Sequence, residues 1–98
     1  MKTIIFCKAG EAISDFEVSE RVDEFLGSLR EEWKISTCLP LHEIRARVKE
    51  DKVKRDDLTI YVENEHGDLR IFDIDKDGRS WDWGKTLDVY SNILMRLL

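Results

Sequence analysis

The fold of this chain is decided by residues 58–74, which read LTIYVENEHGDLRIFDI. Apolar and polar side chains alternate from Leu58 to Glu63 and again from Leu69 to Ile74, as they do in strands that bury one face. Between the two runs, residues 65–68 have the composition of a tight turn. The stretch therefore predicts an antiparallel β-hairpin.

A definite register follows if the loop contains three residues and ends in a left-handed glycine at Gly67. Asn64 then faces Asp68, and Ile60 faces Phe72. One face of the hairpin becomes aliphatic, with Leu58, Ile60, Val62, Phe72 and Ile74. The other face carries Thr59, Tyr61, Leu69, Ile71 and Asp73. We expect the helices to pack on the aliphatic face.

The next segment, DIDKDGRSWDW (residues 73–83), has two interpretations. Asp73, Asp75 and Asp77 occupy the first three ligand positions of a helix-loop-helix calcium loop and Gly78 occupies its glycine position, but the twelfth position is Gly84 instead of a bidentate Glu. A type I turn over residues 75–78 with a left-handed glycine explains the same residues. We favour the turn and assign no metal ligand. A metal-responsive, calcium-binding module using Asp73–Gly78 is the alternative.

Residues 79–83 then form the third strand of a predicted antiparallel meander, with both tryptophans on the face of Tyr61 and Ile71. Exposed aromatic side chains beside acids are typical of protein-binding hot spots. The predicted partner-binding residues are Tyr61, Ile71, Asp73, Trp81, Asp82 and Trp83. In the competing interpretation the C-terminal helix or the N-terminal segment covers the two tryptophans, which then form a second small core.

The rest of the chain completes a two-layer fold. The apolar pattern predicts a buried strand over Thr3–Cys7 and three helices, over Val18–Trp33, from Pro40 to about Asp51 and from about Thr86. Gly27 would lie inside the first helix, where a close approach of another element would explain it. The predicted class is α+β, with a three-stranded antiparallel meander plus an N-terminal strand, in the order β-α-α-β-β-β-α. Residues 1–98 form a single domain.

Composition limits the environment and the partners. The chain has 98 residues, a net charge of −5, and 38% charged residues. Excess negative charge disfavours nucleic-acid binding and favours a basic protein surface. The basic segment 45–55 holds six basic and two acidic residues but no aromatic residue to stack on bases. Without a membrane-spanning run or a secretory signal, we expect a cytoplasmic protein with Cys7 and Cys38 reduced.

No catalytic constellation is apparent in the sequence. Cys7, Cys38, His42 and His66 are too few and too widely spaced for a structural zinc site. We therefore expect no enzymatic activity and no cofactor.

The expected function is that of a small acidic protein-binding module, an inhibitor or adaptor of another protein. In size, charge and aromatic display the chain resembles immunity proteins that neutralise nucleases and phage proteins that block host defence. No motif places it in a named family. An exposed aromatic sheet face is equally compatible with a homodimer.

Overall fold

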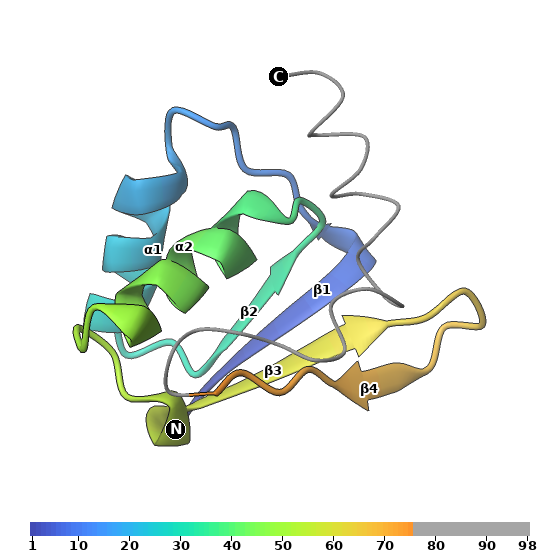
Figure 1. Ribbon diagram of the computed structural model, residues 1–98. Coiled ribbons are helices and arrows are strands. Elements are labelled where there is room, and N and C mark those ends of the chain that lie inside the picture. Colours follow the sequence, from blue (N-terminus) through green and yellow to red (C-terminus); the bar gives the residue numbers. More distant parts are fainter. Residues whose placement is uncertain (76–98) are drawn as a thin grey trace.

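The computed structural model describes residues 1–75, which form an α+β fold with two helices and a four-stranded sheet (Figure 1). The order of elements is β1 (Lys2–Glu11), α1 (Val18–Gly27), β2 (Glu32–Ile35), α2 (Leu39–Lys49), the 3-10 turn η1 (Arg55–Asp57), β3 (Leu58–Glu63) and β4 (Leu69–Ile71). The strand order in the sheet is β2-β1-β3-β4. Neither helix in this part of the chain is long and apolar enough to cross a membrane.

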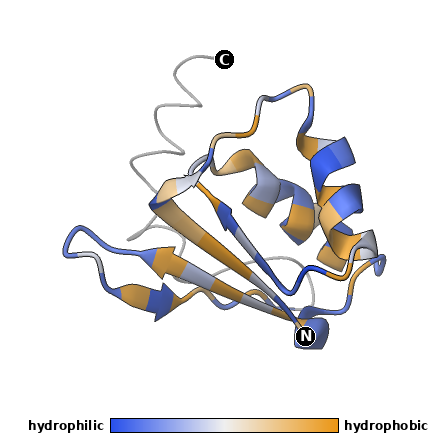
Figure 2. Ribbon diagram, turned by 180° about the vertical axis from the view of Figure 1, so that it is seen from behind, coloured by the Kyte–Doolittle hydropathy of each residue, from blue (hydrophilic) through white to orange (hydrophobic). Residues whose placement is uncertain are grey.

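Strand β1 lies in the middle of the sheet and pairs in parallel with both β2 and β3. Its residues 4–7 are buried without interruption, and the middle of the strand is coloured as hydrophobic (Figure 2). Such a continuous apolar run is typical of a parallel strand whose side chains are buried on both faces of the sheet. The expected buried strand is confirmed, and it extends four residues further, to Glu11.

The core lies between one face of the sheet and both helices, which run side by side (Figure 1). The helices contribute Val18, Val22 and Phe25 from α1 and Leu41, Ile44 and Val48 from α2. Trp33, Ile35, Ile60 and Val62 face them from the strands. The connection from β1 through α1 to β2 and the connection from β2 through α2 to β3 both cross this face, in opposite directions along the sheet. The two crossovers therefore have opposite handedness. One of them is left-handed, which is rare between parallel strands.

The predicted antiparallel meander with three helices is wrong for this part of the chain, because the sheet is mixed and mostly parallel. The error begins in the predicted helix over Val18–Trp33. Helix α1 ends at Gly27, where the backbone amide and the hydroxyl of Ser28 both donate to the carbonyl of Phe25. Trp33 then enters the core from β2, in which exposed and buried residues alternate. In the sequence, Trp33 both continues the helical spacing of the apolar residues before it and alternates with Ile35 as in a strand, so this pattern alone does not distinguish the two.

The explanation offered for Gly27 is also wrong. A side chain at Gly27 would meet nothing within 4 Å, because this residue ends the helix at the surface. The close approach is at Gly10 instead, where an added Cβ would lie 2.3 Å from the backbone carbonyl carbon of Ile35. At this point β1 bends across the end of β2, and both Phe6 and Glu11 pair with Ile35.

The hairpin of β3 and β4 is confirmed in the predicted register. The backbone amide of Asn64 donates to the carbonyl of Asp68 (2.8 Å), and that of Phe72 donates to Ile60 (2.7 Å). Gly67 has the expected positive φ, +83°. Of the two hairpins in the predicted meander, only this first one lies among the described residues. The predicted strand over residues 79–83 and the helix from about Thr86 lie outside them.

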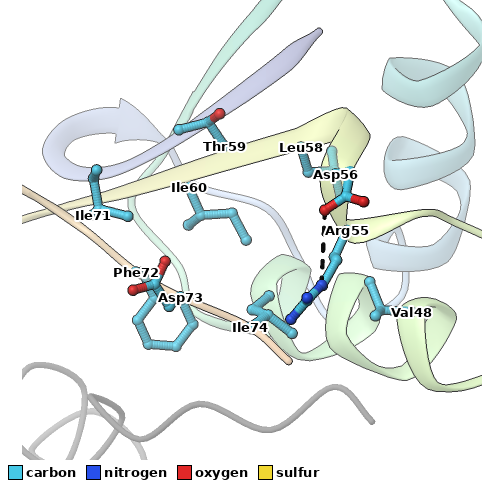
Figure 3. A pocket seen from close by; sticks show the side chains of 10 residues that line it. All are labelled: Val48, Arg55, Asp56, Leu58, Thr59, Ile60, Ile71, Phe72, Asp73 and Ile74. Carbon is cyan, nitrogen blue, oxygen red and sulfur yellow. Dashed lines mark ion pairs between the residues drawn. The ribbon is translucent and has the colours of Figure 1, made fainter. Parts of the chain in front are cut away.

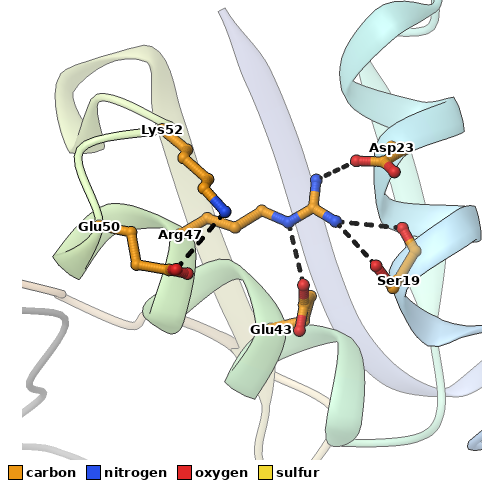
Figure 4. A network of polar contacts seen from close by, with 6 residues as sticks. All are labelled: Ser19, Asp23, Glu43, Arg47, Glu50 and Lys52. Carbon is orange, nitrogen blue, oxygen red and sulfur yellow. Dashed lines mark hydrogen bonds and ion pairs between the residues drawn. The ribbon is translucent and has the colours of Figure 1, made fainter.

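Arg47 ties the two helices together (Figure 4). From α2 it pairs with Glu43 on its own helix (3.1 Å) and with Asp23 on α1. It also donates to the backbone carbonyl (3.1 Å) and the hydroxyl (3.3 Å) of Ser19. Burial lowers the pKa of Arg47, but its bonds to Asp23 and Glu43 outweigh burial and raise it. This residue of the basic segment therefore serves the fold.

Glu11 links the end of β1 to α1 and β2. Its carboxylate accepts from the indole nitrogen of Trp33 (3.2 Å) and pairs with Arg21. The bond from Arg21 holds the pKa of Glu11 below its ordinary value, although partial burial opposes the shift; the Trp33 bond adds to the lowering. The ionised carboxylate thus satisfies the indole N–H of a buried tryptophan.

We expect Glu11→Gln to destabilise the protein at pH 7, by less than about 1 kcal/mol because the carboxylate is partly exposed. A lowered folded-state pKa gives stability that is present above the unfolded value of about 4.3 and is lost as the pH falls through the folded value. The difference between the wild type and the variant should therefore be smaller at pH 3 than at pH 7. Urea unfolding at both pH values measures this, and an equal difference at each would contradict the assignment.

Candidate partner-binding surface

The sheet face opposite the helices carries the described part of the predicted site. Cross-strand pairing aligns Lys34, Ile5, Tyr61 and Ile71 in one row across all four strands. The pair of Tyr61 and Ile71 is the one that the hairpin register predicted. No described helix covers this side, because both helices pack on the other. The row therefore places one aromatic and two aliphatic side chains on this face, of which Ile5 is buried, Tyr61 half-buried and Ile71 exposed.

Exposure in this row increases toward the edge of the sheet. Ile5 is 8% exposed in the central strand and Ile71 is 58% exposed in β4, because an edge residue lacks a neighbour on one side. Leu69, also in β4, is 50% exposed. The other large exposed apolar residues in the described chain, Met1, Phe16 and Leu29, lie in separate segments. Isolated exposed apolar residues are ordinary. Leu69 and Ile71 lie two residues apart on β4, so they form an exposed apolar patch on the face that also carries Tyr61.

Asp73 adds a negative charge beside this patch. Phe72 is buried, Asp73 is exposed and Ile74 is half-buried against the core, so alternation places Asp73 on the side of Ile71. Among the described residues, Asp73 has no hydrogen bond or ion pair. Its carboxylate is therefore available to a partner. The other three predicted site residues, Trp81, Asp82 and Trp83, lie outside the described residues.

A pocket of about 470 Å³ adjoins the patch (Figure 3). Its apolar lining is contributed by Val48, Leu58, Ile60, Ile71, Phe72 and Ile74. Its charged lining residues are Arg55, Asp56 and Asp73. Ile71 and Asp73 belong to both the patch and the pocket, so the two are continuous.

Sequence reasoning missed the contribution of α2 and η1 to this pocket. Val48 and Arg55 fall within the basic segment 45–55, which nothing in the sequence connected with the hairpin. Their contribution depends on how the end of α2 packs beside β3, for which the local sequence carries no signal.

Two titratable groups near the start of α2 have pKa values shifted by burial. Burial raises the pKa of Cys38, and burial with the nearby Arg45 lowers the pKa of His42. Cys7 and Cys38 are both buried free thiols. Within residues 1–75, no group of three or more His, Cys, Asp or Glu side chains is arranged to hold a metal ion. Asp77 and Gly78 of the calcium alternative lie beyond this range.

Millimolar calcium should leave the thermal unfolding midpoint of the full chain unchanged. The reason is the missing bidentate ligand, since Gly84 occupies the position at which calcium loops carry Glu. Differential scanning calorimetry with calcium and with chelator gives the comparison. A midpoint that rises with calcium concentration would revive the metal-responsive alternative, because a ligand that binds the folded state stabilises it.

No protein-family model matches this chain, and comparisons with curated proteins and with solved structures found no significant match.

Proposed function

We propose that this protein is a small acidic protein-binding module, which acts as an inhibitor or adaptor of another protein. Its binding surface is the sheet face that carries Tyr61, Ile71 and Asp73, extended by Trp81, Asp82 and Trp83. The observation that supports this most directly is the Tyr61–Ile71 pair, which turns an exposed apolar edge away from the helices. An aromatic and aliphatic centre with charges at its rim is the usual composition of a protein interface.

Charge supports a partner with a basic surface. The chain carries a net charge of −5, and the exposed residues at the edge of the patch include Glu65, Asp68 and Asp73. Complementary charge steers encounter and selects partners more than it adds affinity. The apolar centre would then supply most of the binding free energy.

Replacing Ile71 with lysine should weaken capture of the partner by at least about tenfold, because it places a desolvation penalty at the centre of the patch. Leu29→Lys is the matched control, since Leu29 is 100% exposed in the loop after α1, outside the patch. The measurement is affinity purification from the native host, followed by calorimetry with the protein that the wild type retains. Equal affinity of both variants for that protein would contradict the proposed surface.

The double variant Trp81→Ala/Trp83→Ala tests the other part of the proposed surface separately. We expect it to lose the same partner that Ile71→Lys loses. Retention by the double variant with loss by Ile71→Lys would confine the surface to β3 and β4. If size-exclusion chromatography instead shows a dimer that Ile71→Lys dissociates, the partner is a second copy of the chain.

A further inference from the structure

The pocket beside β3 combines an apolar wall with an acidic rim. Leu58, Ile60 and Ile74 supply aliphatic surface, and Asp56 and Asp73 are exposed carboxylates. Its volume of about 470 Å³ lies within the range of small-ligand sites. A pocket with an apolar side and carboxylates at its opening suits a ligand that is apolar along its length and positively charged at its end.

We propose that this pocket binds the side chain of an arginine or lysine on the protein partner. The aliphatic stem lies against Leu58, Ile60 and Ile74, and the cationic head lies beside Asp56 and Asp73. Long basic side chains bury their methylene groups in this way while the charge stays near water. The inference rests on the proposed protein-binding function and specifies the chemistry of the partner.

The charges lining the pocket favour a cation. Among the described lining residues, the two carboxylates of Asp56 and Asp73 and the guanidinium of Arg55 leave a net charge of −1. Arg55 pairs with Asp56 at 3.8 Å (Figure 3), and both side chains are more than half exposed. An exposed pair of this length contributes little, so Asp56 can accept a second cation. Asp73 has no charged partner among residues 1–75.

The test is a titration of the full-length, 15N-labelled protein followed by NMR. The probes are the N-acetyl methylamides of arginine, lysine and norleucine, the last of which has an uncharged stem. We expect arginine or lysine to shift the backbone amides of Thr59, Ile60 and Ile74 saturably. Norleucine should bind more weakly by about two- to fivefold, the contribution of one exposed ion pair.

Two isosteric variants separate the pocket from general electrostatics. Asp73→Asn should weaken the basic probe by about two- to fivefold, whereas Glu31→Gln, which removes the same charge from the exposed loop before β2, should not. Equal binding of norleucine, equal effects of the two variants, or shifts confined to residues outside the pocket would each overturn the proposal.

The titration contains no partner, so its result is independent of the surface test. If the pocket binds the basic probe but Ile71→Lys retains the partner, the proposed surface fails and the cation pocket stands. If the probe fails while Ile71→Lys still loses the partner, the protein-binding function stands without the basic anchor.

Discussion

Replacing Trp33 with alanine should destabilise the protein by about 3–5 kcal/mol, the largest effect expected from any single truncation. Trp33 is 1% exposed and stacks on Phe25, with ring centroids 5.2 Å apart. Its removal leaves a cavity between β2 and α1 and deprives Glu11 of the indole bond. The loss is a large share of the stability of about 5–15 kcal/mol typical of a small domain. Urea unfolding followed by circular dichroism measures it.

Two controls separate the contributions of Trp33. Trp33→Phe keeps most of the ring volume but removes the indole N–H, so it should cost clearly less than alanine. Leu29→Ala removes a fully exposed apolar side chain and should change stability by no more than about 0.5 kcal/mol. A cost below about 1 kcal/mol for Trp33→Ala would place this residue outside the core and contradict the assignment of β2.

Gly10→Ala should destabilise the protein by about 3 kcal/mol or more, a large effect for one added methyl group. The new Cβ would lie 2.3–2.6 Å from the backbone carbon, oxygen and nitrogen of Ile35. Ile35 is completely buried, and its backbone cannot rotate away as a side chain would. Either β1 or β2 must shift, at a point where Ser36 donates its backbone amide to Glu11 (2.9 Å). The thermal midpoint and the urea midpoint should both fall.

Gly27→Ala is the matched control for this substitution. Its Cβ would meet nothing within 4 Å, and Ala is the better helix former by about 1 kcal/mol. We expect this variant to be as stable as the wild type or slightly more stable. If the two glycine variants behave alike, β1 does not cross closely over Ile35.

Part of the candidate site followed from the sequence because its cause is local. The turn before Gly67 and the two alternating runs specify a hairpin register between segments a few residues apart. That register brought Tyr61 opposite Ile71 and separated the aliphatic face from the face with Asp73. The start of α2 near Pro40 was likewise set by a local signal, since proline suits the first turn of a helix.

Other parts depend on contacts between segments distant in the chain. Parallel pairing of β1 with β2 and β3 leaves no turn signature, because a helix intervenes in each connection. The spacing of Trp33 therefore suggested a helix, and the predicted N-terminal strand ended at Cys7, before Gly10. The pocket also required α2 and η1 to pack beside the start of β3.

By itself, then, the sequence determined the α+β class, the β3–β4 hairpin and which of its residues share a face. Turn chemistry and strand alternation act over a few residues, so they are legible in the chain. The tertiary structure alone decided that β1 is central, that Trp33 lies in a strand and that Gly10 meets Ile35. Those outcomes depend on which distant surfaces bury each other, and burial is settled only when the whole core packs.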